Sequence, residues 1–181
     1  MKNNLSNYAI RLSKLKIEFN EIETKLRKKK KKFNENQQKV YDFVIYKKDI
    51  IQFSINQEQF FIKKGNEYKG FMHILLRHYG EECEGKLTAT NILNIATTIK
   101  MGTYYKSEKN DYMTISNNFN GTRYKIVFSK EINGNWIVSY YSVEEWSGKR
   151  ATALKPLTGN LNENGYGNLS TPSNRSLTYR Y

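Results

Sequence analysis

The two histidines of the chain, His73 and His78, lie five residues apart, and Arg77 directly precedes the second. Histidine has an unperturbed pKa close to neutrality, so it serves readily as a general acid or base. Arginine keeps its charge and offers paired donors that suit a phosphate. The pattern therefore indicates proton transfer on a phosphate-bearing substrate, although two histidines ending an apolar helical turn could equally lie at a core edge.

Helical geometry limits which of these side chains can act together. His73 and Arg77 are four residues apart, so they share one face of a helix. His78 lies about 140° around an ideal helix from His73. Either the helix ends at Arg77 and frees His78 to swing inward, or only one of the two histidines is catalytic.

Hydroxyl groups further along the chain are candidate partners for this site. Ser139 and Tyr141 lie on the last predicted strand, where a hydroxyl could hold a phosphate oxygen and a ring could stack on a base. Packing is the alternative, because the chain has 14 tyrosines. Thr88 and Thr90 precede a predicted helix, where a threonine can cap the helix and also bind an anion.

Positive charge is concentrated near the N-terminus. The formal net charge is +13, and residues 1–32 hold 11 Lys/Arg against 3 acids, a net of +8. A basic balance suggests a polyanion such as nucleic acid. The lysine run is either a phosphate-binding group or a solvated, self-repelling helix end; its members are Lys28, Lys29, Lys30, Lys31 and Lys32.

Several classes of protein are disfavoured by the sequence. Cys83 is the single cysteine and lies among acids, which argues against a disulfide scaffold and a reactive thiolate. No cysteine–histidine spacing indicates zinc, and no metal or cofactor is expected. The longest apolar run is too short to span a bilayer, and the N-terminus lacks a signal-peptide core. We expect a cytoplasmic protein without membrane insertion.

The sequence predicts a long amphipathic helix over residues 4–33. Its apolar positions alternate by three and four residues, a heptad seam without proline or glycine. We expect this helix to pair with a copy of itself or to pack on its own domain, with self-association favoured. The seam consists of Leu5, Tyr8, Leu12, Leu15, Phe19, Ile22, Leu26, Lys29 and Phe33.

The remaining elements predict an α+β fold, with two helices packed on an antiparallel β-meander behind the coiled-coil-like N-terminal helix. Strands are expected at 50–55 and 59–62, helices at 70–79 and 90–101, and further strands at 103–106, 111–117, 122–129 and 135–143. Asn120-Gly121 and Asn133-Gly134 are typical hairpin turns. We divide the chain into a basic helix and connector (1–49), an α+β domain (50–150) and a loosely ordered tail (151–181).

The stretch His-Ile-Leu-Leu-Arg-His-Tyr-Gly at residues 73–80 resembles the His-Ile-x-x-Arg-His-Gly motif of phage-associated nucleases of the barnase–EndoU–colicin–RelE-like superfamily. The following order of acidic loop, helix and strands ending in tyrosine is also similar, over roughly residues 58–143. Tyr79 departs from the family motif. The resemblance implies a small α+β fold and a metal-independent ribonuclease, often a toxin or phage effector.

The resemblance also assigns roles to residues and partners. It implies catalysis by His73, Arg77 and His78 with a hydroxyl on the last strand, through attack of the ribose 2′-hydroxyl on phosphate. The expected partners are RNA, with tRNA one candidate, an immunity or antitoxin protein, and a second copy of the chain. The main alternative is a non-enzymatic phage or mobile-element protein, an inhibitor among them, that binds nucleic acid or a protein through the N-terminal helix and basic run.

Overall fold

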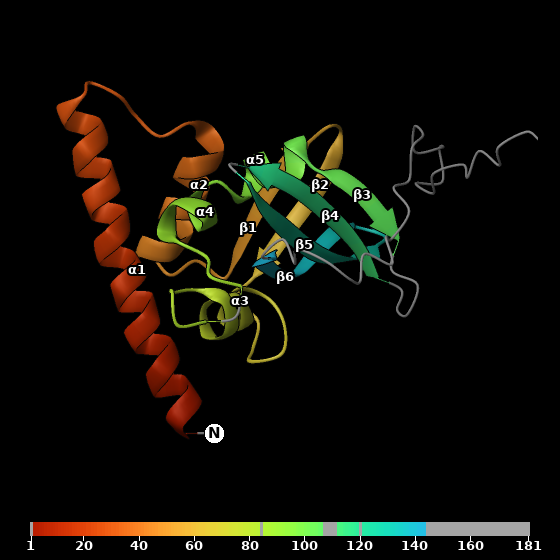
Figure 1. The fold of residues 1–181 in the computed structure, drawn as a ribbon, viewed down its shortest axis with the longest axis horizontal. Coiled ribbons are helices and arrows are strands. Elements are labelled where there is room, and N and C mark those ends of the chain that lie inside the picture. The colour runs from red at the N-terminus through yellow and green to blue at the C-terminus, as the bar shows by residue number, and fades with distance from the viewer. Residues whose placement is uncertain (1, 84, 107–111, 120, 144–181) are drawn as a thin grey trace, which may run out of the picture.

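The computed structural model describes residues 2–83, 85–106, 112–119 and 121–143. The chain has a mixed α+β fold with a long N-terminal helix and a six-stranded sheet (Figure 1). The predicted tail at 151–181 and Asn120 of one predicted turn lie outside the described residues. The elements in chain order are α1 (Lys2–Lys28), α2 (Glu35–Ile45), β1 (Ile50–Ile55), β2 (Glu58–Lys63), α3 (Phe71–His78), α4 (Ala89–Leu93), α5 (Ile95–Met101), β3 (Thr103–Lys106), β4 (Tyr112–Phe119), β5 (Thr122–Glu131) and β6 (Gly134–Val143).

The sheet has the strand order β1-β2-β6-β5-β4-β3. Strands β3 to β6 pair antiparallel in sequence order, and β1 and β2 form a separate antiparallel pair. The two parts join through a short parallel contact in which Phe60 pairs with Asn135 and Phe61 with Trp136. The sheet is therefore not antiparallel throughout, and the first two predicted strands extend it at the β6 edge.

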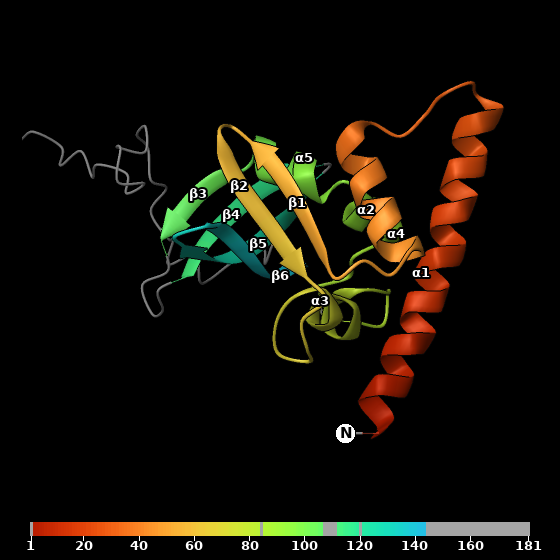
Figure 2. The ribbon, with the colours of Figure 1, turned by 180° about the vertical axis from the view of Figure 1, so that it is seen from behind.

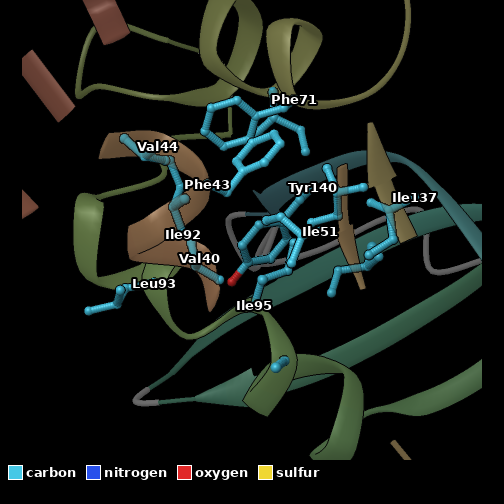
Figure 3. Packing of buried hydrophobic residues seen from close by; sticks show 14 of the residues in the cluster. Val40, Phe43, Val44, Ile51, Phe71, Ile92, Leu93, Ile95, Ile137 and Tyr140 are labelled. Atoms are coloured by element: carbon cyan, nitrogen blue, oxygen red, sulfur yellow. The ribbon is translucent and has the colours of Figure 1, made fainter. Parts of the chain in front are cut away.

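One face of the sheet packs against α2, α4 and α5 and forms the core. Figure 3 shows Tyr140 of β6 among apolar side chains from these helices and from β1. The Tyr140 ring is 1 % exposed, and its hydroxyl is 3.1 Å from that of Thr98 on α5. Phe43 of α2 meets Phe71 of α3 edge to face, with ring centroids 4.9 Å apart. These contacts fix α3 relative to the sheet.

The opposite face of the sheet carries the alternate side chains and is called here the outer face. The strand registers place on it, in adjacent rows, Phe61 of β2, the β6 residues Trp136, Ser139 and Tyr141, the β5 residues Arg123 and Lys125, and the β4 residues Ser116 and Asn118. All of these except buried Ser139 and exposed Asn118 are partly buried. A bulge at Val138 keeps Trp136 and Ser139 on the same face despite their spacing of three.

Helix α1 lies along the side of its own domain, next to α2, α3 and α4 (Figure 2). Leu15 and Phe19 of the predicted seam are fully buried there, whereas Leu5 is 62 % exposed. The helix predicted over residues 4–33 was too long at its C-terminal end. Helix α1 ends at Lys28, and Lys30 adopts a left-handed φ of 54°. Repulsion among consecutive lysines disfavours a further turn. Intramolecular docking of the seam is thus observed, while self-association stays a prediction.

Most other predicted elements differ from the observed ones by one or two residues at an end, and two of the differences change the local structure. The single helix expected at 90–101 is divided at Asn94, whose side chain donates to the Thr90 carbonyl and accepts a hydrogen bond from Gln37. These side-chain bonds compete with a continuous helix. The second hairpin loop consists of Ile132 and Asn133, and Gly134, at φ 127°, already pairs with Glu131.

Candidate functional site

Helix α3 fills a gap beside strand β6. Because β2 pairs with β6 only at Phe60 and Phe61, the edge of β6 beyond Trp136 needs other partners. The Gly70 amide, just before α3, donates to the Val138 carbonyl at 2.8 Å. The Gly85 carbonyl, after α3, accepts from the Ser142 amide at 2.8 Å. These two bonds hold the histidine-bearing helix against the strand that carries Ser139 and Tyr141.

The ring of His73 is oriented by the loop that precedes α3. The Asn66 side chain accepts from the Tyr68 and Lys69 amides, which shapes a tight turn. The turn presents the Glu67 carbonyl to His73 Nδ1 at 2.9 Å. A carbonyl oxygen only accepts, so Nδ1 carries the proton and the neutral ring keeps its lone pair on Nε2. The contact with the Glu67 carbonyl thereby fixes the orientation of the His73 ring.

His78 is the last residue of α3, and its ring meets both His73 and Tyr141. The His73 and His78 ring centroids are 5.2 Å apart with an edge-to-face angle of 79°. The His78 and Tyr141 centroids are also 5.2 Å apart. As in the first of the two alternatives drawn from helix geometry, the helix ends at this point and the His78 ring lies against that of His73, although α3 includes His78 and so ends one residue later than Arg77. Both histidines belong to one site.

Gly85 closes the site on the side of the loop after α3. Its φ is +89°, a left-handed conformation that favours glycine. A Cβ there would lie 2.7 Å from Tyr141 Cβ and 2.9 Å from His78 Nδ1. The backbone at position 85 thus packs directly on the His78 ring and on the Cβ of Tyr141, and a larger residue would displace one of these two side chains. Sequence analysis assigned no role to this glycine.

Lys125 is a cationic residue of the site that sequence analysis did not select. It pairs with Tyr141 across the β5–β6 register, so the two side chains lie side by side on the outer face. Burial, and then the neighbouring Arg123 charge, lowers the pKa of Lys125. Burial also raises the pKa of Tyr141, which keeps its hydroxyl protonated as a donor. The alternation at 122–129 was the available signal, since Lys125 shares one strand face with Arg123 and Ser129 while Ile126 and Phe128 lie on the other.

Ser139 contributes a buried hydroxyl between Trp136 and Tyr141. The residue is 8 % exposed, and its Oγ has no hydrogen-bond partner within the described part of the chain. A buried hydroxyl without a partner is unfavourable, and it gains most from a ligand that accepts its proton. Ser139 is consequently suited to an anionic oxygen at this site.

Arg77 does not join this cluster. Its side chain is exposed, and it forms no hydrogen bond or ion pair in the ranges that the structure describes. Although it shares a helix face with His73, the contacts of His73 run to Glu67 and His78 instead. A role of Arg77 in phosphate binding therefore stays a prediction, and Lys125 is the cation nearest to Tyr141 in the strand register.

The predicted RNA-binding residues lie elsewhere. Thr88 is the N-cap of α4, where its hydroxyl accepts from the Asn91 amide, and Thr90 lies exposed in the same short helix. Lys28 to Lys32 are all exposed at the end of α1. Arg11, 17 residues before Lys28, is one of the α1 residues that contact α3. At 1.5 Å per residue, the basic run lies about 25 Å along the helix from that contact.

Two further properties concern the described residues only. They contain no group of three or more His, Cys, Asp or Glu side chains arranged to hold a metal ion. Their helices include none with the length and apolar character needed to cross a membrane. No family model, curated protein or solved structure matches this chain.

Proposed function

We propose that the protein is a ribonuclease that cleaves RNA by attack of the ribose 2′-hydroxyl on the adjacent phosphate. The observation that carries the proposal is the contact of the two imidazoles with each other and of His78 with Tyr141. Lys125 pairs with Tyr141 across the strands, and the unpartnered hydroxyl of Ser139 lies on the same face. Paired acid and base groups with a nearby cation are the requirements of this reaction.

The orientation of His73 supports a division of roles. Nε2 of His73 takes the proton from the 2′-hydroxyl while the O2′–phosphorus bond forms. His78, in its protonated form, gives its proton to the leaving 5′-oxygen while the phosphorus–O5′ bond breaks. Lys125 and the Ser139 hydroxyl stabilise the negative charge that develops on the phosphoryl oxygens. The products are a 2′,3′-cyclic phosphate and a 5′-hydroxyl end.

The test is cleavage of a labelled RNA oligonucleotide by the purified full chain in EDTA. We expect products with 2′,3′-cyclic phosphate ends, and no cut where the nucleotide 5′ to the scissile phosphate is 2′-deoxy. His73→Ala and His78→Ala should each lower the rate by ~100- to 10,000-fold with little change in Tm, because each removes one proton-transfer group. Variants that lose rate and Tm together would indicate a structural role for the histidines.

A nucleic-acid-binding protein without catalysis is the second candidate. The observation in its favour is that Lys28 to Lys32 form an exposed basic group well separated from the histidines. RNA binding that persists in the absence of any cleavage by the full chain would favour this candidate. The phage or toxin context and an immunity partner remain proposals that follow from the motif resemblance.

A further inference from the structure

A second cluster on the outer face lies further along β6 from the histidines. The rings of Phe61 and Trp136 are stacked, with centroids 4.7 Å apart and planes 23° apart. The ammonium of Lys63, two residues beyond Phe61 on β2, lies 3.9 Å from the centroid of the Trp136 ring. The cluster therefore combines an aromatic surface with a positive charge, and both are features of sites that bind single-stranded nucleic acid.

Two hydrogen-bond donors in this region have no partner. Trp136 Nε1 and Ser139 Oγ are both buried and unpaired within the described residues. Both residues lie on the outer face of β6, because the bulge at Val138 restores their common orientation. The indole N–H and the serine hydroxyl can both donate, so each would gain a hydrogen bond from an acceptor such as a phosphate or base oxygen.

Strand β6 connects the aromatic cluster of Phe61 and Trp136 with the histidine site. Trp136, Ser139 and Tyr141 occupy successive outer-face positions of β6, which span about 15 Å at the usual rise of a strand. Lys63 ends β2, and the loop after it presents the carbonyl that orients His73. A polynucleotide strand lying along β6 would thus pass from the aromatic pair to the histidines.

We propose that Phe61, Lys63 and Trp136 form a nucleotide subsite for an unpaired strand. A base flanking the scissile phosphate stacks on Trp136 in place of the Lys63 ammonium, and Lys63 moves to the phosphate. Trp136 Nε1 and Ser139 Oγ donate to the same nucleotide. The part of this inference that leads the nucleic-acid strand toward the histidines rests on the proposed function. Bases in a duplex are already stacked and paired, so the subsite selects single-stranded substrate.

The experiment measures binding apart from cleavage. A labelled 2′-O-methyl oligoribonucleotide lacks the nucleophile, so its affinity for the full chain can be determined by fluorescence anisotropy. We expect Trp136→Leu to weaken binding by about 5- to 150-fold, the usual cost of losing one stacked base. Trp136→Phe should lose less, because it keeps an aromatic ring for stacking although it removes the N–H and part of the ring area. The same oligomer annealed to its complement should bind equally to wild type and Trp136→Leu.

Lys63→Met provides a second variant at an exposed residue. It should make the negative slope of log affinity against log salt less steep by about 0.7, which corresponds to one phosphate contact on a single strand. Lys100→Met is the matched control, because Lys100 is exposed on α5. The control should change neither affinity nor slope. Lys63→Met would also be informative if Trp136→Leu failed to fold.

The outcomes separate this subsite from the proposed function. Wild-type affinity in Trp136→Leu and an unchanged salt slope in Lys63→Met would overturn the subsite, even if the protein cleaves RNA. Binding that depends on Trp136 in a protein without cleavage would support the subsite and contradict the nuclease proposal. Equal dependence on Trp136 for duplex and single strand would refute selection of unpaired bases.

Discussion

Gly85 shows how a single residue without functional groups can control the candidate site. We predict that Gly85→Ala lowers the cleavage rate by at least about tenfold, because its Cβ would push against His78 and Tyr141, and small displacements of catalytic groups are costly. Gly121→Ala is the matched control, since Gly121 also has a positive φ of 76° but has nothing within 4 Å of its Cβ position.

Stability separates the two effects of these glycine variants. Both should lose roughly 1–2 kcal/mol of folding free energy for placing alanine in a left-handed conformation, and Gly85→Ala should lose more because its Cβ also meets His78 and Tyr141. Thermal melts and single-turnover rates measured on the same samples give the comparison. Equal activity of Gly85→Ala and Gly121→Ala would show that the packing of residue 85 on His78 and Tyr141 is unimportant for chemistry.

Lys125 connects the chemistry of the site with the pH dependence of folding. Its pKa is lowered in the folded protein by burial and by Arg123, while the unfolded chain keeps the ordinary value near 10.4. Between these two pKa values the unfolded state binds more protons, so the free energy of unfolding rises with pH in that window. Below the window the charged Lys125 destabilises the fold.

Lys125→Met should therefore raise the stability of the protein and lower its cleavage rate. We expect Tm at pH 7 to rise by roughly 1–4 °C, and the gain to shrink as the pH approaches 10. The cleavage rate should fall by ~100-fold or more, because a charge that stabilises the transition state is lost. Melts between pH 6 and 9.5 check the first effect, with exposed Lys100→Met as control. A lower Tm across this range would contradict the argument.

At the scale of elements, α1 is coupled to α3 through Arg11. Its guanidinium donates to the carbonyls of Leu75 and Tyr79 at the end of α3 and pairs with Glu82 at 3.2 Å. A cation at a helix C-terminus satisfies carbonyls that lack a helical partner and complements the helix dipole. Arg11 thus holds the turn of α3 from which His78 projects.

We predict that Arg11→Met lowers the free energy of unfolding by roughly 1.5–3 kcal/mol, the range for hydrogen bonds to charged groups. Arg27→Met is the control on the same helix, because the Arg27 side chain is 77 % exposed and its ion pair among the described residues is with Glu23. Its loss should be about 0–1 kcal/mol. Urea titrations of the two variants provide the measurement. Similar losses in both would mean that the contacts of Arg11 with α3 add nothing.

The elements also show what sequence patterns can and cannot predict. Strands 50–55 and 103–106 were predicted with their observed bounds, because alternation and turn residues are local signals. The parallel contact of Phe61 with Trp136 was not predictable, since alternation identifies a face but names no partner strand. The heptad seam likewise identified the buried face of α1 without showing whether its own domain or a second copy would cover it.

The same limit applied to the candidate site. The residue types alone identified four candidate site residues, because imidazoles and strand hydroxyls have recognisable chemistry: His73, His78, Ser139 and Tyr141. The contact between the imidazoles depends on where α3 ends, and the role of Gly85 depends on a loop that no periodicity describes. Lys125 joins the site through a cross-strand register, which is a property of the fold and not of a motif.

At the scale of the whole molecule, the basic run and the histidines are separate in space, so binding and chemistry should be separable. Lys30, Lys31 and Lys32 are exposed beyond the end of α1, far along that helix from its contact with α3. Positive charge there can attract RNA over a distance set by screening without touching the scissile bond. The run would then act on affinity and encounter rate only.

We therefore predict that replacing Lys30, Lys31 and Lys32 by glutamine weakens RNA binding and reduces the slope of log affinity against log salt by up to about 2, or 0.7 for each lost phosphate contact. The single-turnover cleavage rate at saturating RNA should stay within about twofold of wild type, because no group of the histidine site changes. The control replaces Lys47, Lys100 and Lys106, which are exposed but scattered, and so removes the same net charge. If both triple variants lower the slope equally, net charge and not the run attracts RNA. A lower saturated rate in the Lys30–Lys32 variant alone would instead place the run in the catalytic complex.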